Sequence, residues 1–400
     1  MSRSEPTRPR ARPGFWAFFA LVAMLCGPGC LTPYLARAPQ AKPQPKPWGK
    51  GPDLSGRLIV DSPRNDTDPD LQSPGTSIET WVVHTRACEQ ILGTNPWTGL
   101  TVARLDEHGG PLHGAEPEEL LQQMAGRPVV ILIHGNGYGY RDAIKEGIEV
   151  RAKLEAKGGF APDSLFVIFD WPSERSLKDI IVDLNEKARR SRVAGYHLAR
   201  ILQASPPESR ICLMGQSDGG RIVLTTTHLL SGAELPRFLR EPSCQLSSGR
   251  RDLRIRCIAL DAAAAHDWLD PGHRLQQTLP TCEALLNLPN RRDYALAVYT
   301  FGRYTGNGGA IGRVGLTWLD RHRLGPLADK VEEIDHFKLS GMAHTLFTQA
   351  LDFPVVSDRI AAYTSWGDIE AGRLGEGRLR KVRQAPANVP QAAAMSLPPE

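Results

Sequence analysis

The sequence predicts an α/β fold, a mostly parallel β-sheet with helices on both faces. Between about residues 79 and 365, short apolar runs alternate with longer amphipathic stretches. This alternation is typical of parallel sheets whose strands are connected by helices. One apolar run leads directly into a glycine-flanked serine, Gly215-Gln216-Ser217-Asp218-Gly219. Because such sheets carry their active sites at the carboxyl ends of the strands, chemistry is expected at this segment.

Seven apolar runs have the length of strands. They are residues 79–86, 129–133, 164–171, 211–214, 254–260, 294–301 and 331–337. Amphipathic stretches predict helices at residues 140–157, 176–203 and 219–231. Two further long stretches, residues 231–254 and 262–292, are candidates for a lid over the site.

The first 30 residues predict a targeting segment. Four arginines precede an apolar run at residues 15–26, which is about as long as a signal-peptide core and short for a bilayer span. Gly29 and Cys30 then follow, and a small residue before a cysteine resembles a bacterial lipobox, although Gly27 stands where a leucine is expected. We therefore expect lipidation at Cys30 and a protein anchored to a bacterial membrane in the cell envelope. A secreted or periplasmic protein is the alternative.

Composition divides the remainder of the chain into three parts. Residues 31–62 are rich in Pro, Lys, Gln and Gly, which predicts a flexible tether. Residues 63–383 hold the predicted strands and helices and form the expected folded domain. Residues 384–400 are rich in Ala, Pro and Gln and are expected to be a disordered tail.

Charge and cysteine content exclude several classes of function. The chain has 48 basic and 44 acidic residues, a net charge of +4, which is too mild to indicate a nucleic-acid partner. It has no C-x-x-C pair, and His134, Asp170 and His266 match no known metal spacing, so neither a metal nor a cofactor is expected. Five cysteines follow the leader, an odd number that leaves at least one thiol free in an exported protein. Cys244 and Cys282 are candidates for a disulfide.

Ser217 is the candidate nucleophile. Its surroundings fit G-x-S-x-G, the pattern of a tight strand-to-helix turn that exposes a serine hydroxyl at the edge of a sheet. Small residues flank such a serine because the turn is strained. The pattern predicts acyl transfer, with the hydrolysis of an ester as the first candidate, and this chemistry requires a base and an orienting carboxylate.

Chain order selects the base. In a sheet of this kind the serine is followed by an acid and then by a histidine after the last strand. His344 fits, because it follows residues 331–337 and precedes a helical stretch, and His336 is the alternative, although it lies in the predicted strand itself. The other downstream histidines are expected in loops or on the surface.

Asp261 is the candidate acid. It ends the apolar run of residues 254–260, so its carboxylate is expected at the active edge. The next predicted strand, residues 294–301, ends without an acid. Asp267 and Asp270 are the alternatives, and Asp261 ahead of four alanines is also a good helix cap.

The oxyanion hole is expected to use the backbone N–H groups of Asn136 and Asp218. Asn136 follows the apolar run that ends in His134-Gly135, and Asp218 follows the nucleophile. The carboxylate of Asp218 would add negative charge beside a developing oxyanion, so we expect it to be solvated and turned away. His134, Tyr138 and Trp171 are candidate substrate-binding residues, with packing beneath loops as the alternative.

Five segments in order resemble bacterial α/β-hydrolases of unknown function. They are Thr85-Arg86, His134-Gly135 with Arg141-Asp142-Ala143, Phe169-Asp170-Trp171-Pro172-Ser173, Ser217-Asp218-Gly219-Gly220-Arg221, and Ala343-His344. The resemblance spans about residues 79–365 and implies the α/β-hydrolase fold without fixing a substrate. Two departures stand out. The family usually has an apolar residue where this chain has Asp218, and usually has Ser-x-x-Asp after the strand assigned here to residues 294–301. Asp261 instead resembles the acid of secreted lipases.

These observations predict a serine hydrolase that acts on carboxylic esters through Ser217, Asp261 and His344, with a small-molecule or lipid ester as substrate. The alternative is a non-catalytic envelope protein that retains the fold for binding. Amide or thioester hydrolysis would need the same residues and is separable by assay alone.

Overall fold

The computed structural model describes residues 78–88, 99–106, 108–174, 180–236, 244–297, 299 and 308–369. Contacts divide the chain into two units, residues 1–49 and 50–400, and all described residues belong to the second. The predicted leader with Cys30, the tether and the tail lie outside the described residues. None of the helices in the described part is long and apolar enough to cross a membrane.

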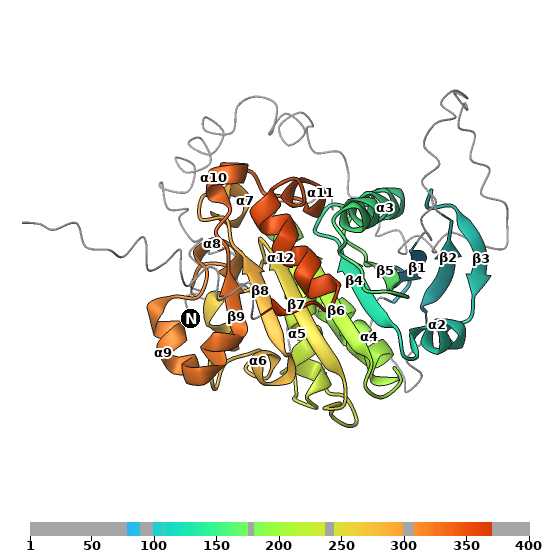
Figure 1. Cartoon of the computed structure of the whole chain (residues 1–400). Helices are drawn as coiled ribbons and strands as arrows, with labels where there is room; N and C mark the ends of the chain where they lie inside the picture. The colour runs from blue at the N-terminus through green and yellow to red at the C-terminus, as the bar shows by residue number, and fades with distance from the viewer. Residues whose placement is uncertain are drawn as a thin grey trace, which may run out of the picture. The chain divides into compact units, whose positions relative to one another are not determined.

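One sheet holds nine strands among the described residues, in the order β3-β2-β1-β5-β4-β6-β7-β8-β9 (Figure 1). Pairing is parallel from β1 to β9 along this order and antiparallel for β1 with β2 and β2 with β3. The strands are β1 Glu79–His84, β2 Thr101–Leu105, β3 Pro111–Ala115, β4 Pro128–Ile133, β5 Leu165–Asp170, β6 Arg210–Gln216, β7 Arg254–Leu260, β8 Ala284–Leu288 and β9 Val331–Glu333.

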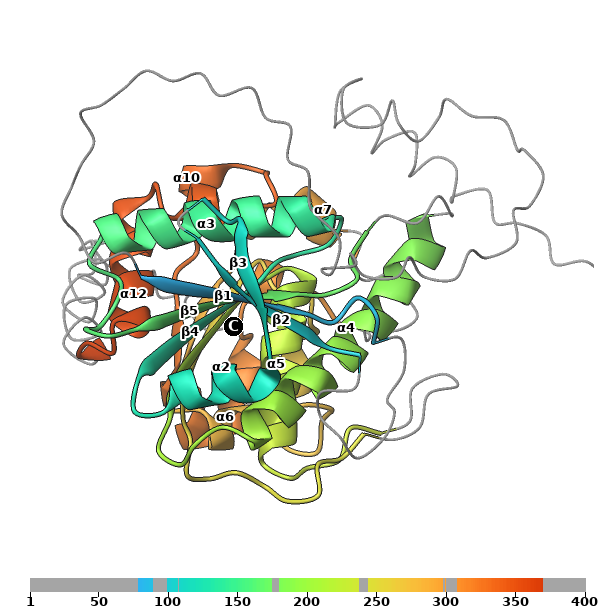
Figure 2. The same ribbon diagram turned by 90° about the vertical axis from the view of Figure 1, so that its right-hand side faces the viewer.

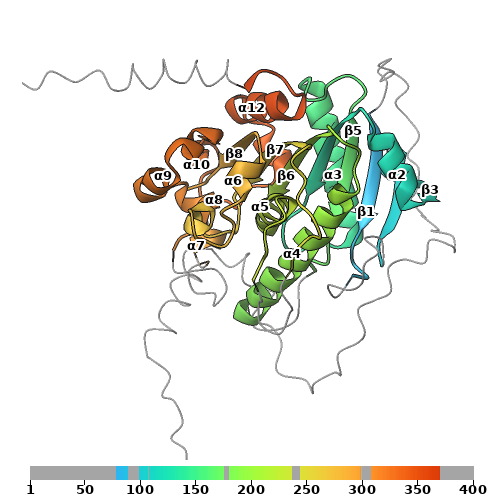
Figure 3. The ribbon, with the colours of Figure 1, turned by 90° about the horizontal axis from the view of Figure 1, so that it is seen from below.

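Helices cover both faces of this sheet, as the sequence predicts. The longer ones are α2 Pro117–Met124, α3 Tyr140–Ala156, α4 Ile180–Gln203, α5 Asp218–Leu230, α9 Trp318–Leu324 and α12 Pro354–Thr364. Short helical segments are η1 His266–Leu269, α6 Thr278–Thr281, α7 Tyr294–Ala297, α8 Ile311–Val314, η3 Gly325–Lys330, α10 Phe337–Ser340 and α11 Phe347–Ala350. Figure 2 shows α3 on the opposite side of the strands from α4 and α5, and Figure 3 likewise separates α12 from that pair.

Alternation along the buried strands explains the two faces. In β4, Val129 and Ile131 belong to the core cluster that includes α4 and α5, whereas Val130 belongs to the cluster that includes α3 and α12. Every residue of β4 is buried. A strand covered on both faces is therefore a continuous apolar run, and that is how the sequence identifies it.

The sheet differs from the sequence prediction on its β8 side. Tyr294–Ala297 forms helix α7 rather than the start of a strand, and the strand after β7 is β8, within the stretch assigned to a lid. The lid prediction is therefore wrong for residues 262–292. β8 has only five residues, all buried, and one of them is the polar Asn287. A run this short cannot be identified as a strand from its periodicity. Of the other lid stretch, Leu235 and Cys244 form an isolated bridge, and residues 237–243 lie outside the described part.

Two smaller features of the sheet also differ from the sequence prediction. The antiparallel strands β2 and β3 are absent from the sequence prediction. The run at residues 331–337 is a strand only over Val331–Glu333, so His336 lies beyond β9, immediately before α10.

Candidate active site

Ser217 lies in the turn between β6 and α5. Its φ is 56° and its ψ is −118°, a left-handed region that a residue with a side chain rarely adopts. The Ser217 N–H donates to the Leu260 carbonyl at 2.9 Å, and the Ser217 carbonyl accepts from the Ala263 N–H at 2.9 Å. The end of β7 thus holds the strained turn in place, as a nucleophile elbow requires.

Close approach of the backbone explains both glycines that flank this serine. A Cβ at Gly215 would lie 2.3 Å from the Gly219 carbonyl oxygen, and a Cβ at Gly219 would lie 2.3 Å from the Ile133 carbonyl oxygen. The first contact closes the turn on itself. The second brings the start of α5 directly against the end of β4, which carries the His134-Gly135-Asn136 loop.

His344 lies in the loop between α10 and α11, and its side chain is 19 % exposed. Its Nδ1 is 2.5 Å from Oδ2 of Asp293 and 3.9 Å from Oδ2 of Asp261. The nearer acid is therefore one that the sequence analysis missed. Asp293 follows β8, and its Oδ1 accepts the Leu296 N–H at 3.0 Å.

The wrong strand assignment hid Asp293. With residues 294–301 read as a strand, Asp293 lay before that strand. With β8 as the strand, Asp293 follows it, where the resemblance requires an acid. The apolar run Ala284–Leu288 followed by Pro289 and Asn290 was the available signal.

Asp261 does lie at the edge of the sheet, but its carboxylate makes its hydrogen bonds with His336 and Thr345 and not with His344. It is fully buried with φ 45°. Its Oδ1 is 3.0 Å from Nε2 of His336, and its Oδ2 accepts the Thr345 N–H at 2.8 Å. Burial raises the pKa of Asp261, and His336 and His344 counteract this in part. The contacts of Asp261 therefore hold the loop that carries His344.

The alternative residues from the sequence face other partners. Nε2 of His336 is bound to Asp261 as above, and its Nδ1 is 2.9 Å from Oγ of Ser340. Oδ2 of Asp267 is 3.4 Å from Nδ1 of His273, and Oδ2 of Asp270 is 3.1 Å from Nη1 of Arg323. Neither of these aspartates contacts His344.

Nearby acids control the ionisation of His344. Burial lowers its pKa, but the hydrogen bond and charge of Asp293, with the charges of Asp261 and Asp218, outweigh burial and raise the pKa above its usual value. Asp261 links this histidine to the elbow, because it lies 3.9 Å from His344 and directly follows Leu260, which accepts the Ser217 N–H. Among the described residues, Oγ of Ser217 makes no hydrogen bond. In substrate-free enzymes such bonds are often long.

The prediction of a solvated Asp218 is wrong. The residue is 5 % exposed, and its Oδ1 is 2.9 Å from Nη1 of Arg221, one helical turn away in α5. Nε of Arg221 donates to the Ala263 carbonyl at 2.6 Å. Burial raises the pKa of Asp218 and Arg221 counteracts this in part. The ion pair turns the carboxylate along α5 and offsets its charge near the site.

Two backbone N–H groups are available beside Ser217. Within the described part of the chain, those of Asn136 and Asp218 donate no hydrogen bond. Asp218 is the first residue of α5, where N–H groups lack partners inside the helix. The N–H groups of Gly137 and Tyr138 instead donate to the carbonyl and hydroxyl oxygens of Ser173, at 2.7 and 3.1 Å, and fix the loop that carries Asn136.

A buried cluster of charged side chains around Asp170 is joined to the loop that carries Asn136. Oδ1 of Asp170 is 3.0 Å from Nε2 of His134, and its Oδ2 is 2.7 Å from Nδ1 of His84. Nε and Nη2 of Arg86 reach the two carboxylate oxygens of Asp170, each at 2.5 Å. Burial alone would raise the pKa of Asp170, but these partners hold it well below its usual range. Nδ1 of His134 is 2.9 Å from the Gly135 carbonyl, which links the cluster to the loop.

This burial argues against the predicted substrate contacts of His134 and Trp171. Trp171 is 0 % exposed and His134 is 2 % exposed. Trp171 Nε1 donates to the His134 carbonyl at 2.9 Å, and the two rings stack at 5.9 Å. Tyr138 is partly exposed, 5.0 Å from the His134 ring. The alternative of packing beneath loops therefore describes His134 and Trp171 better.

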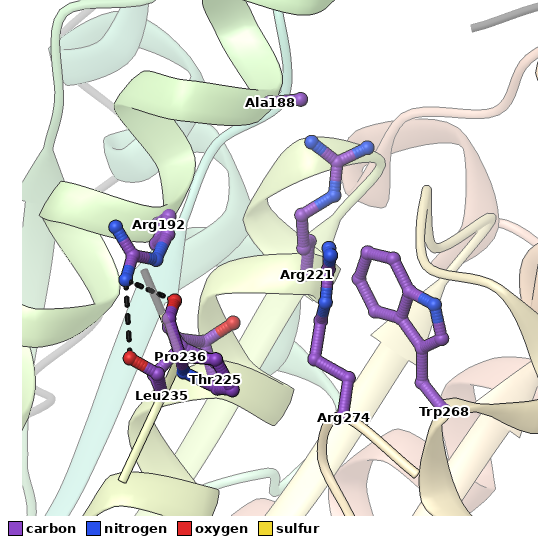
Figure 4. Close-up of a pocket in the computed structure, with 8 residues that line it drawn as sticks. All are labelled: Ala188, Arg192, Arg221, Thr225, Leu235, Pro236, Trp268 and Arg274. Atoms are coloured by element: carbon purple, nitrogen blue, oxygen red, sulfur yellow. Dashed lines mark hydrogen bonds between the residues drawn. The ribbon is translucent and has the colours of Figure 1, made fainter. Parts of the chain in front are cut away.

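A small cavity lies between α4, α5 and η1, where three arginines converge (Figure 4). Nη2 of Arg192 donates to the carbonyls of Leu235 and Pro236 at 3.1 and 2.6 Å. The Arg274 guanidinium lies 4.6 Å from the Trp268 ring, and its pKa is lowered by burial and by Arg221 and Arg192. The cavity measures about 20 Å³. This volume suits one or two waters, so an acyl chain does not fit.

One cluster of possible metal ligands lies at the site, although the sequence predicts no metal. Within the described residues, Asp261, Asp293 and His344 bring one ligand atom each within 4.8 Å of the others. A cation there would compete with the hydrogen bond between Nδ1 of His344 and Asp293. Cys244 and Cys282 are both buried, and the candidate disulfide between them is not formed.

Residues 115–234 match the model of a family described as alpha/beta hydrolase of unknown function (DUF900). The match covers the His134 loop and Ser217 but ends before both acids and His344. Among solved structures, esterase B from Lactobacillus rhamnosis, crystallised with a tributyrin phosphonate, aligns with 13 % identity over 76 % of this chain and 87 % of that one, with a TM-score of 0.33. A TM-score this low carries no argument about the site. No curated protein sequence matches.

Proposed function

We propose that this chain, an α/β-hydrolase by fold and family, is a serine hydrolase that cleaves carboxylic esters with Ser217 as nucleophile, His344 as base and Asp293 as the acid. The observation that carries the proposal is the pairing of Asp293 with His344 at 2.5 Å, together with the strained left-handed turn that holds Ser217. Asp293 replaces Asp261 in the predicted triad because it is the nearer carboxylate.

Each residue has a distinct task in the proposed reaction. Asp293 accepts the Nδ1 proton of His344, so Nε2 is left as the acceptor for the Ser217 proton. Ser217 Oγ then attacks the ester carbonyl and forms a tetrahedral intermediate. His344 gives the proton to the departing alcohol, and an acyl-enzyme remains. Water activated by His344 hydrolyses this acyl-enzyme and restores Ser217.

The oxyanion of each intermediate would be stabilised by the N–H groups of Asn136 and Asp218. Neither donates elsewhere among the described residues, and Asp218 adds the positive end of the α5 dipole. Losing one such donor typically costs about 10²–10³ in kcat. The contacts of Ser173 with the loop support its role in keeping Asn136 in position.

The alternative function, an envelope protein that binds a ligand without catalysis, is favoured by one observation. Asp218 puts a carboxylate next to the nucleophile, where charge develops in the transition state. Its ion pair with Arg221 offsets that charge, so we prefer the hydrolase. Lipidation at Cys30, attachment to the envelope and a lipid ester substrate remain proposals from the sequence.

Labelling with a fluorophosphonate probe tests the proposal. The probe reacts with an activated serine, so the chain should be labelled, and Ser217→Ala should not. Ser231→Ala, at the end of α5, is the matched control and should be labelled like the parent chain. A folded parent chain that resists the probe would favour the binding function. Labelling that survives Ser217→Ala would mean that another serine is the nucleophile.

A further inference from the structure

Three apolar side chains are exposed at one edge of the described structure. Tyr294 in α7 is 44 % exposed, Leu339 in α10 is 50 % exposed, and Met342 just after α10 is 54 % exposed. We call these three residues the apolar rim. Figure 1 shows both α7 and α10 at the upper end of β8 and β9. Contiguous apolar patches on a protein surface mark interaction sites.

The rim borders the catalytic pair. Tyr294 directly follows Asp293, and Met342 precedes His344 by two residues. The Tyr294 N–H donates to the Met342 carbonyl at 3.2 Å, so the two segments lie side by side. Whatever binds the rim is therefore held next to the proposed site of ester cleavage.

One buried side chain keeps the rim in shape. Asn290 is 0 % exposed, and its Nδ2 donates to Oγ of Ser340 and to the carbonyls of Gly341 and Ala343 at 3.1, 3.1 and 2.8 Å. These bonds tie the loop after β8 to the turn after α10. The apolar side chains are thus presented by an ordered backbone, so little conformational entropy is lost when they bind.

Basic residues lie next to the rim residues in the sequence. Arg291, Arg292 and Lys338 are all exposed. The Arg292 guanidinium lies 5.2 Å from the Phe337 ring, and Nε of Arg291 is 3.1 Å from Oδ2 of Asp335. Asp293 is buried against His344, and Asp335, whose side chain is 22 % exposed and paired with Arg291, is the other acid among residues 290–294 and 335–343 of the described chain. The local charge is positive.

We propose that the apolar rim and its basic neighbours dock on an anionic lipid surface and bring the active site against it. Apolar side chains flanked by Lys and Arg are the pattern of surfaces that insert into the headgroup region while their cations bind anionic lipids. A stable protein interface needs about 20–30 residues a side, and the rim is much smaller. The role in catalysis rests on the proposed function, whereas the docking itself needs no chemistry.

A site-specific fluorescent label tests the docking in the full chain with Ser217→Ala. Met342→Cys carries an environment-sensitive dye, and Leu319→Cys carries it in the control. Leu319 is 42 % exposed in α9, which Figure 1 shows at the other end of β8 and β9. The five described cysteines are buried, and Cys26→Ser and Cys30→Ser remove the two in the leader. Vesicles contain phosphatidylcholine alone or with phosphatidylglycerol.

Docking predicts a blue shift and quenching by brominated lipid at residue 342, with neither at residue 319. The shift should grow with phosphatidylglycerol and shrink with salt. Arg292→Gln and Lys338→Gln should each weaken the association about fivefold. A label at residue 342 that stays in water against both vesicles overturns the proposal. So does a shift that depends on protein concentration without vesicles, which would mean that a second copy covers the rim. Because Ser217 is absent throughout, neither result depends on hydrolase activity.

Discussion

Nδ1 of His344 lies 2.5 Å from Oδ2 of Asp293 and 3.9 Å from Oδ2 of Asp261. The two acids come from the ends of adjacent strands, β8 and β7, and converge on one ring nitrogen. Asp261 already satisfies His336 and the Thr345 N–H. The division suggests that Asp293 orients the base while Asp261 holds its loop.

Asparagine substitutions separate these roles. In Asp293→Asn the side-chain amide can accept the Leu296 N–H only by donating its NH₂ to His344, which selects the wrong tautomer. We expect kcat to fall by about 10³–10⁴. In Asp261→Asn the amide can accept the Thr345 N–H and donate to His336, so we expect a loss below about tenfold. Ester hydrolysis by both variants, with unfolding curves to verify folding, provides the measurement. A larger loss in Asp261→Asn would restore Asp261 as the acid.

The ionisation of His344 predicts the acid limb of the pH profile. The base must be neutral to accept the Ser217 proton, and the surrounding acids raise its pKa. We therefore expect kcat/KM to rise with pH through a pKa above about 6.5. Asp218→Asn removes one of the charges that raise this pKa, so the limb should move to lower pH. Asp352→Asn, an exposed acid paired with Lys153, should leave the limb in place. An unchanged limb in Asp218→Asn would contradict this coupling.

The contact between α5 and β4 predicts a steric effect at Gly219. A Cβ there would lie 2.3 Å from the Ile133 carbonyl oxygen, a backbone atom that cannot move aside easily. We expect Gly219→Ala to lower the free energy of unfolding by about 1–3 kcal/mol and to displace the oxyanion loop. Gly114→Ala is the control, because a Cβ there meets nothing within 4 Å. Urea unfolding compares the two variants, and equal stability would argue against the contact.

The Asp170 cluster predicts a pH-dependent contribution to stability. The pKa of Asp170 is lowered in the folded state, so its contribution is complete above the unfolded value near 4 and is lost as pH falls toward the folded value. Asp170→Asn leaves Arg86 buried without its carboxylate and should cost about 3–5 kcal/mol at pH 7. The variant should lose less stability than the parent between pH 5 and pH 3. Asp252→Asn, which breaks an exposed pair with Arg250, should cost less than about 1 kcal/mol. Equal pH slopes for parent and Asp170→Asn would contradict the assignment.

Local sequence patterns were sufficient to predict an element where the apolar or amphipathic run was long, or where its residues formed a distinctive motif. Residues 254–260 were predicted as a strand and form β7, and residues 140–157 were predicted as a helix that is α3 over Tyr140–Ala156. The pattern around Ser217 predicted the elbow, because Gly215 and Gly219 are required by contacts within a few residues or with the adjacent strand. Burial of both faces makes such strands apolar throughout, so they are visible in the sequence.

Tertiary structure decided what depends on pairing between distant segments. Ala284–Leu288 is a strand because β7 and β9 flank it, and its own five residues do not distinguish it from a loop. That strand then sets the position of Asp293, and therefore which acid meets His344. The same holds for Asp218, whose burial against Arg221 depends on how α5 packs. The sequence by itself determined the strained turn at Ser217 and the class of sheet. Distances between loops, which no local sequence pattern encodes, determined which acid meets His344.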